Sequence, residues 1–151
     1  MKSIVYGFEG RLRLCNPCVS LDDPHNFDES SALARAFSKD IPPEATNVRI
    51  IDRSEIPRDR TFRNAWEDTG TITVNMPLAR EIWRDKMRQA RAPKLEALDV
   101  EYMQADEVGD ASKKAIVAQK KKALRDVTSD PAIEAAQTPE ELKLFWPSIL
   151  S

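Results

Sequence analysis

The sequence predicts an α+β fold, in which a small, mostly antiparallel sheet with one short helix precedes a long helical hairpin and a short terminal helix. Short alternating or β-branched runs lie in the first half of the chain, whereas the second half carries apolar residues at helical spacing over longer runs. Val108-Gly109-Asp110 divides that second half into two amphipathic helices, and so short a connection favours an antiparallel pair. We therefore expect a β-rich platform over residues 1–75 and the helical hairpin and terminal helix over residues 76–151.

Residues 4–6 and 11–15 are predicted as the first two strands, joined by a tight turn between Gly7 and Gly10. Residues 11–15 alternate arginine with apolar residues, and this period of two indicates a strand with one buried and one solvated face. Because only the turn separates the two strands, we expect a β-hairpin. Residues 16–28, rich in Pro, Asp and Asn, are predicted as a loop.

A short helix is predicted over residues 29–39, with Asp28 as its N-cap. Two prolines at positions 42 and 43 stop it, because proline lacks an amide donor and pushes its predecessor out of the α region. Residues 47–52 and 71–74 are predicted as the third and fourth strands from their β-branched content and alternation.

Residues 54–66 are predicted as an ordered but irregular segment or a single turn. Phe62 and Trp66 lie four residues apart, so both can anchor one face. Three arginines form the strongest local basic cluster, namely Arg58, Arg60 and Arg63. They are either a clamp for phosphate or carboxylate groups or the partners of nearby acids around the aromatic anchor. The interleaved acids favour the second interpretation; they are Asp52, Asp59, Glu67 and Asp68.

The first long helix is predicted to begin after Asn75 as its cap, with Pro77 in its first turn. Pro93 interrupts the helix, so we expect a kink or a short break near residues 91–92. The pattern of apolar residues continues on both sides of that point. Its members are Ala79, Ile82, Trp83, Met87, Ala90, Leu95, Leu98, Tyr102 and Ala105.

The second helix is predicted over residues 111–126, after a tripeptide that combines helix stop, turn and N-cap. The terminal helix is predicted to start at Thr138, with Pro139 in its first position and Glu141 completing a capping box. Pro147 is expected to end it.

Several short motifs follow one another in a fixed order over residues 80–148. Arg88-x-x-Arg91 precedes Leu98-Asp99, a charged helix leads into Ala123-Leu124-Arg125-Asp126, and Trp146-Pro147 closes the series. This order resembles the bacteriophage tail assembly chaperone family found beside tail-fibre genes. In that family a helix with an Arg and Leu-Asp pattern is followed by an Ala-Leu-Arg-Asp turn and a terminal Trp-Pro. The Arg-Thr-Phe-Arg-x-Ala-Trp sequence of residues 60–66 is similar to a segment of other phage-encoded proteins.

The resemblance implies a binding or assembly role, with a phage tail or tail-fibre protein as partner. It places the protein in the host cytoplasm during assembly or in the virion tail, with the helical hairpin as the recognition element. Arg125 is expected to pair across the hairpin, and Asp126 to cap backbone amides near Thr128. Residues 1–75 exceed the shorter family members, so a small virion adaptor is the alternative to a chaperone. The alternative function is a phage-encoded inhibitor that binds a host protein.

The residues expected to bind a partner are the aromatic and charged positions of these motifs. They are Arg60, Phe62, Arg63, Trp66, Trp83, Tyr102, Arg125, Asp126, Trp146 and Pro147. Aromatic anchors dominate interface energies, each costing about 2 kcal/mol or more when truncated at a hot spot. Packing within the chain is the other interpretation for the aromatic residues, least so for Trp146. Self-association into a homo-oligomer is also left open.

The composition favours a folded domain without a nucleic-acid or membrane partner. Hydrophobic residues make up 41% of the chain, enough for a core, and 23 basic residues nearly balance 25 acidic ones. The lysines at positions 120–122, with Lys113 and Lys114, are interpreted as a solvated hairpin face, with a nucleic-acid contact as the alternative. No apolar stretch approaches the length that crosses a bilayer.

We expect no cofactor, no metal site and no enzymatic activity. Cys15 and Cys18 form a CxxC pair that is interpreted as a plain turn, with a redox pair or half of a metal site as alternatives. His25 is the only histidine, and the sequence has neither a glycine-rich phosphate loop nor an activated-serine motif. A redox or regulatory enzyme that uses the two cysteines is the third hypothesis.

Overall fold

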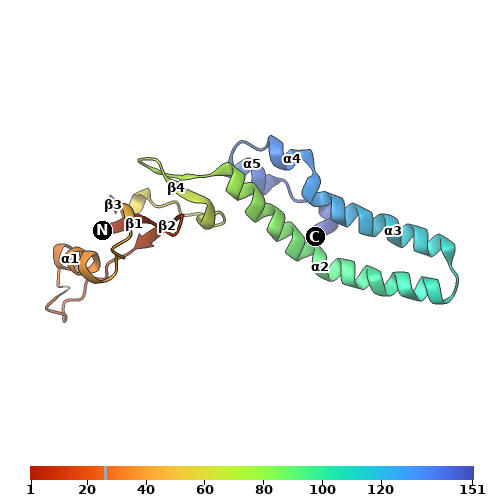
Figure 1. The fold of residues 1–151 in the computed structure, drawn as a ribbon, viewed down its shortest axis with the longest axis horizontal. Helices are drawn as coiled ribbons and strands as arrows, with labels where there is room; N and C mark the ends of the chain where they lie inside the picture. Colours follow the sequence, from red (N-terminus) through yellow and green to blue (C-terminus); the bar gives the residue numbers. More distant parts are fainter. Residues whose placement is uncertain (26) are drawn as a thin grey trace. The chain divides into compact units, whose positions relative to one another are not determined.

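The computed structural model describes residues 1–25 and 27–151 and confirms the α+β fold class. Contacts divide the chain into two compact units, Met1–Asn75 and Met76–Ser151. Figure 1 shows the strands and a single helix in the first unit, and only helices in the second. We call them the sheet unit and the helical unit.

The sheet unit is built on three antiparallel strands in the order β2-β1-β3. The strands are β1 (Lys2–Phe8), β2 (Arg11–Cys15) and β3 (Thr46–Asp52). Phe8 pairs with Arg11, so the turn between β1 and β2 has two residues, and both of these, Glu9 and Gly10, have positive φ angles of 51° and 71°. This is the backbone that a two-residue hairpin turn requires, and glycine adopts it without steric cost. The predicted β-hairpin is therefore confirmed.

Gly7 lets β3 approach β1 closely where the pairing of these strands shifts register, between Val5 and Gly7. A Cβ atom on Gly7 would lie 2.6 Å from Oγ1 of Thr46, closer than such contacts allow. A side chain at this position would therefore require the Thr46 side chain to move.

Helix α1 (Glu29–Lys39) contacts β1 and buries Ala32 and Ala36. The Asp28 carboxylate accepts the Ser31 amide at 2.7 Å, as expected for the predicted N-cap. Ile4 of β1 is fully buried, together with its neighbour Val5. The small alanines of α1 allow the helix to lie close to the sheet.

After β3 the chain makes two 3₁₀ turns, η1 (Arg53–Glu55) and η2 (Arg63–Ala65), and then a second sheet. Here β4 (Trp66–Asp68) pairs antiparallel with β5 (Ile72–Val74). The sequence did not predict β4. The expected fourth strand is β5, and it pairs with β4 in a separate two-stranded sheet. A three-residue strand carries no periodicity of its own, because tertiary pairing creates it.

Arg49 on β3 joins the three-stranded sheet to β4 through Asp68. Its Nε and Nη2 donate to the two Asp68 carboxylate oxygens at 2.6 and 2.7 Å, and the Gly70 amide adds a third hydrogen bond at 3.1 Å. The Arg49 guanidinium is the main reason that the pKa of the Asp68 carboxyl lies below its usual value. The pair therefore stabilises the folded state only while Asp68 is ionised.

We predict that Asp68→Asn lowers the midpoint of thermal unfolding at neutral pH and makes stability less sensitive to acid. A depressed carboxyl pKa contributes stability above the ordinary Asp value of about 4, and this contribution is lost as the pH falls through the depressed pKa. The midpoints of thermal unfolding of the native protein and of Asp68→Asn should thus differ near neutral pH and converge in strong acid. The exposed Asp126→Asn serves as the control, and an equal gap between native protein and Asp68→Asn at both pH values would contradict the assignment.

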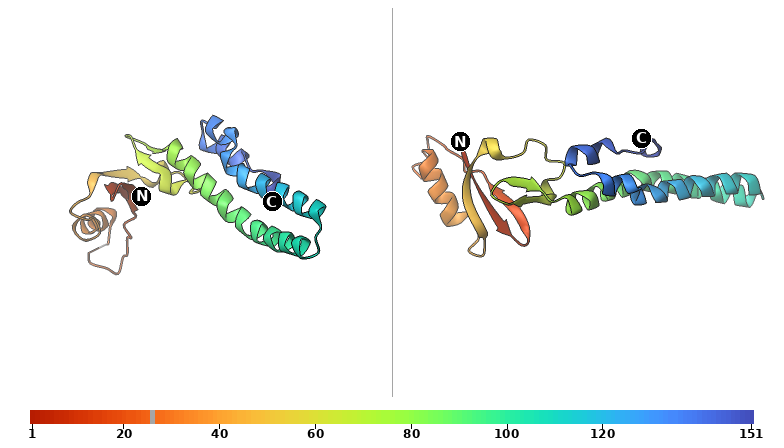
Figure 2. Two further views of the ribbon diagram at one scale, coloured as in Figure 1. Left: turned by 45° about the vertical axis from the view of Figure 1, so that its right-hand side comes forward. Right: turned by 90° about the horizontal axis from the view of Figure 1, so that it is seen from above.

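The helical unit begins with an antiparallel pair, α2 (Met76–Glu107) and α3 (Ala111–Asp126). Helix α3 lies beside the second half of α2 in Figures 1 and 2, with Lys121 paired to Asp99 and Arg91 donating to the Arg125 carbonyl near the end of α3. Gly109 has a φ angle of 70° and the Asp110 carboxylate accepts the Lys113 amide at 2.8 Å, which confirms the predicted turn and cap. The buried residues of this pair include Met87, Leu98, Ala105, Val117 and Leu124.

Helix α2 continues through Pro93 without the short break that the sequence suggested. Figure 1 shows the helix changing direction part-way along its length. Proline removes the hydrogen bond to the carbonyl four residues earlier, that of Gln89. Pro93 and Gln89 are both exposed, so water can solvate that carbonyl, while packing on η3 and α5 before Pro93 and on α3 after it holds the helix together.

Two short α-helices and two 3₁₀ turns complete the unit: η3 (Val127–Ser129), α4 (Pro131–Ala135), α5 (Pro139–Leu144) and η4 (Ser148–Leu150). The sequence did not predict α4. At α5, Thr138 Oγ1 accepts the Glu141 amide at 3.2 Å, but the Glu141 carboxylate accepts from Gln137, one residue before the expected partner. Helix α5 ends at Leu144, ahead of the predicted stop at Pro147.

Within the described residues, no helix combines the length and the apolar character needed to span a membrane.

Candidate functional site

Three arginines of α2 hold the chain that follows α3 by donating to backbone carbonyls. Arg80 Nη2 donates to the Ala136 carbonyl at 2.8 Å, Arg84 Nε to that of Thr128 at 3.2 Å, and Arg91 Nη1 to that of Arg125 at 2.8 Å. The last carbonyls of a helix lack intrahelical partners, and guanidinium groups satisfy them well. The sequence patterns did not reveal these contacts, because each joins residues more than thirty positions apart.

Trp83 fixes the terminal segment, residues 145–151, against α2. Its Nε1 donates to the Phe145 carbonyl at 2.9 Å, and the ring is only 8% exposed. The Trp146 ring meets it edge-on, with 5.4 Å between ring centroids and 70° between planes. Lys94 Nζ donates to the Ser151 carbonyl and holds the far end of the segment. Trp83 is therefore an internal anchor, whereas Trp146 remains 36% exposed.

An apolar groove of about 440 Å³ opens on the helical hairpin beside this segment. Its accessible surface is almost entirely apolar and comes from α2, α3 and Ile149 of η4. Charged residues at its edge contribute the methylene parts of their side chains. The residues that line the groove are Lys94, Ala97, Leu98, Glu101, Lys120, Leu124 and Ile149. Ile149 is 37% exposed, and it follows Trp146 by three residues. We call the groove together with Trp146 the hairpin groove site.

The roles expected of Arg125 and Asp126 are taken by other groups. The Arg125 side chain is exposed, and its backbone carbonyl, which accepts from Arg91, makes the contact across the hairpin. Asp126 stands before η3, but its side chain makes no capping hydrogen bond. The backbone of Asp126 is itself helical, so α3 runs into η3 without an open helix start that needs a cap.

Tyr102 packs within the hairpin, in the half nearer the α2–α3 turn, and is not a fully exposed residue. Nζ of Lys114 and of Lys121 each lie 5.4 Å from the centre of its ring, and the ring is partly buried. The same lysines pair with Asp106 and Asp99 of α2. Much of the lysine run therefore serves the hairpin itself, while Lys113, Lys120 and Lys122 remain exposed.

The candidate residues of the sheet unit separate into core and surface. Phe62 and Trp66 are 3% and 6% exposed, so they belong to the core, whereas Arg60 and Arg63 are exposed. Among the described residues, no acid pairs with the arginines of the 58–63 cluster. The interpretation that nearby acids neutralise these arginines is therefore wrong. Asp52 pairs with Lys2, Asp68 with Arg49, Glu67 accepts from Asn75, and Asp59 accepts the Thr61 amide.

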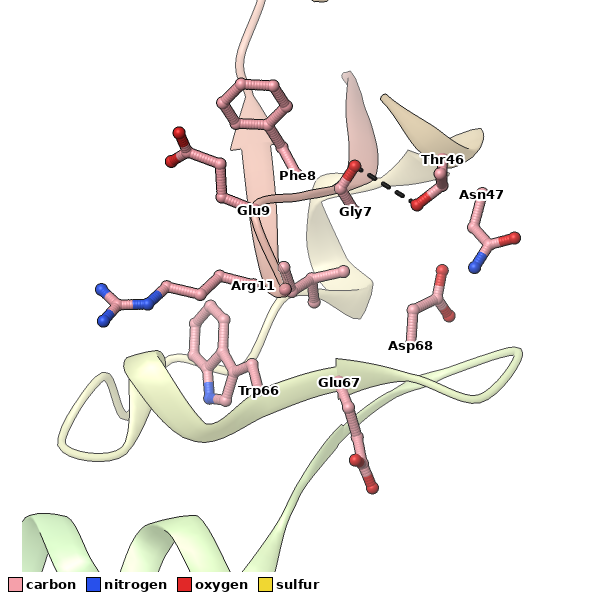
Figure 3. Close-up of a pocket in the computed structure, with 11 residues that line it drawn as sticks. Gly7, Phe8, Glu9, Arg11, Thr46, Asn47, Trp66, Glu67 and Asp68 are labelled. Atoms are coloured by element: carbon pink, nitrogen blue, oxygen red, sulfur yellow. Dashed lines mark hydrogen bonds between the residues drawn. The ribbon is translucent and has the colours of Figure 1, made fainter. Parts of the chain in front are cut away.

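A second hollow, of about 360 Å³, lies in the sheet unit between the β1–β2 turn and β4. Figure 3 shows Asp68 pointing towards Asn47 in this hollow and Glu67 pointing away from it. Thr46 Oγ1 donates to the Gly7 carbonyl at 3.4 Å across its wall. Because Asp68 is already engaged by Arg49, its carboxylate serves to join the two sheets.

The two cysteines are free thiols with different surroundings. Cys15 is partly buried, and burial, with a smaller contribution from Asp40, raises the pKa of its thiol. Reactive cysteines have a lowered pKa, so these surroundings favour the plain-turn interpretation for Cys15. Cys18 is exposed, and its Sγ lies 3.9 Å from the Val19 carbonyl. Over residues 1–25 and 27–151, no group of three or more His, Cys, Asp or Glu side chains is arranged to hold a metal ion.

Comparison of the chain with protein-family models, with curated proteins and with solved structures finds no match.

Proposed function

We propose that the protein is a non-enzymatic bacteriophage tail or tail-fibre-associated protein that binds a fibre or tail protein through its helical unit. It acts as an assembly chaperone or as a small virion adaptor. The observation that carries the proposal is the hairpin groove site, which lies within the segment that resembles the chaperone family. The Trp146-Pro147 motif of that resemblance ends two residues before Ile149, which lines the groove.

The hairpin groove site has the composition of a protein-binding surface. Its centre is aliphatic and its edge is charged by Lys94, Glu101 and Lys120, while the accessible Trp146 belongs to the same terminal segment as the lining residue Ile149. An apolar centre, a polar rim and an aromatic anchor are the usual anatomy of an interface. A groove of this kind suits the apolar face of an amphipathic helix or a short apolar segment of the partner.

The terminal segment holds Ile149, its groove-lining residue, in a fixed position. Hydrogen bonds from Trp83 and Lys94 hold the two ends of the segment, and Leu150 is buried between them and the hairpin. Because Ile149 is ordered before binding, association loses less conformational entropy. The sheet unit is a separate compact unit with a surface of its own for a second attachment, which favours the adaptor form of the proposal.

Mass spectrometry of purified phage particles and of the infected-cell lysate tests this function. Stoichiometric peptides of the chain in particles would support the adaptor, and abundance in lysate together with co-purification of a tail or fibre protein would support the chaperone. Absence from particles with retention of a host protein alone would contradict both and favour the inhibitor of a host protein.

A further inference from the structure

Three arginines line one hollow of the sheet unit, beside η1. Its volume is about 370 Å³, and its lining is mainly polar. No acidic residue belongs to the lining, which consists of Asn16, Arg53, Ile56, Pro57, Arg58 and Arg60. We call it the arginine hollow.

The acids next to these arginines in sequence have other partners. Asp52 pairs with Lys2 at 2.9 Å, Glu55 accepts the Asp52 amide at 2.8 Å, and Asp59 accepts the Thr61 amide at 2.8 Å. Within the described residues, no ion pair joins Arg53, Arg58 or Arg60 to a carboxylate. The hollow therefore concentrates three positive charges that the chain does not neutralise.

Arg53 is held in place at the hollow by a hydrogen bond to the backbone. Its Nη2 donates to the carbonyl of the buried Pro17 at 2.9 Å, which fixes the guanidinium. Its Nε is buried and is without an acceptor among the residues described. Because that nitrogen is enclosed, a ligand in the hollow would be bound by Arg58, Arg60 and the part of Arg53 that lines the hollow.

We propose that the arginine hollow binds a phosphate group, independently of the function assigned to the helical unit. A carboxylate carries one charge and is satisfied by one bidentate arginine, whereas a phosphate carries about two charges at neutral pH and offers more acceptor oxygens. Three guanidinium groups and the Asn16 amide around one hollow match the larger set of acceptors. The bound group belongs either to free phosphate or to a phosphomonoester.

Titration of the ¹⁵N-labelled full chain with inorganic phosphate, followed by backbone amide shifts, tests this site. Ionic strength is held constant with sodium chloride, and O-phosphoserine and acetate are titrated in parallel. We expect saturable shifts at Asn16, Ile56 and Arg58 with phosphate and weaker ones with acetate. Saturation by O-phosphoserine as well as phosphate would identify the ligand as a phosphomonoester group, and saturation by phosphate alone would identify the free ion.

The exposed pair of arginines supplies the variant that leaves the fold intact. Arg58→Gln combined with Arg60→Gln should weaken the phosphate midpoint by about tenfold or more, since each lost charge-assisted hydrogen bond is worth about a factor of ten. Arg63→Gln removes the same charge from the same segment but does not line the hollow, so it should leave the midpoint at Asn16 and Ile56 unchanged. Linear shifts, equal responses to acetate and phosphate, or equal losses in both variants would overturn the proposal.

Discussion

Trp83→Ala is expected to destabilise the helical unit by about 3–5 kcal/mol, the usual cost of removing a large buried aromatic side chain. Trp83 is 8% exposed, packs edge-on against Trp146 and donates to the Phe145 carbonyl at 2.9 Å. Its loss would leave a cavity beside α2 and release the terminal segment. We therefore expect both a lower stability and a more accessible backbone over residues 145–151.

Urea unfolding followed by circular dichroism measures this effect, because most helical residues of the chain lie in the helical unit. Two variants separate packing from hydrogen bonding. Trp83→Phe keeps one aromatic ring but loses the pyrrole ring and its N–H, so it should cost about 1–3 kcal/mol, less than Trp83→Ala. Trp146→Ala removes the exposed partner ring and should cost about 0.5–1.5 kcal/mol. An unchanged unfolding midpoint in Trp83→Ala would show that the terminal segment is held by other contacts.

Trp146→Ala should, by contrast, have its largest effect on partner binding. The Trp146 ring is 36% exposed and packs on Trp83, in the terminal segment whose Ile149 lines the apolar groove. Truncating a hot-spot aromatic residue costs about 2 kcal/mol or more, which corresponds to roughly a thirtyfold rise in Kd. Ile149→Asp, which places a charge in the lining of the groove, should weaken binding by a similar factor.

Calorimetry measures these changes in Kd, with the purified chain and the tail or fibre protein recovered with it. Val108→Ala is the matched control, because Val108 is apolar and 78% exposed but lies at the hairpin turn and does not line the groove. It should bind like the native chain. Equal losses of affinity in these two variants and in Val108→Ala would show that the interface lies outside the hairpin groove site. The absence of any loss in Trp146→Ala and Ile149→Asp would show the same.

Local signals predicted the regular elements of this fold well. The alternation of β2, the N-cap of α1 and the stop-turn-cap tripeptide before α3 placed those three elements at their observed bounds. Each signal is written in adjacent residues and needs no distant partner. The first strand was placed too short, since residues 4–6 were expected and β1 spans Lys2–Phe8.

Features that depend on distant contacts could not be read from the sequence. Strand β4 exists because it pairs with β5, and α2 continues through Pro93 because it packs on η3 and α5 before that residue and on α3 after it. The arginines that bind carbonyls across the hairpin gave no local signal, although Arg91 belongs to the motif order that suggested a family. The sequence identified aromatic residues as candidates for binding, but it could not show which of them are exposed. Only the structure separates the buried Phe62, Trp66 and Trp83 from the accessible Trp146.

Site-specific photo-crosslinking from position 146 tests the central claim most directly. A photoreactive phenylalanine analogue would replace Trp146 in the full chain, expressed in phage-infected cells, with position 108 as the control. We expect crosslinks from position 146 to a phage tail or fibre protein, at least several times more abundant than those from position 108. Crosslinks from position 146 to a host protein alone, or equal yields from both positions, would contradict the claim that the hairpin groove site binds the tail machinery.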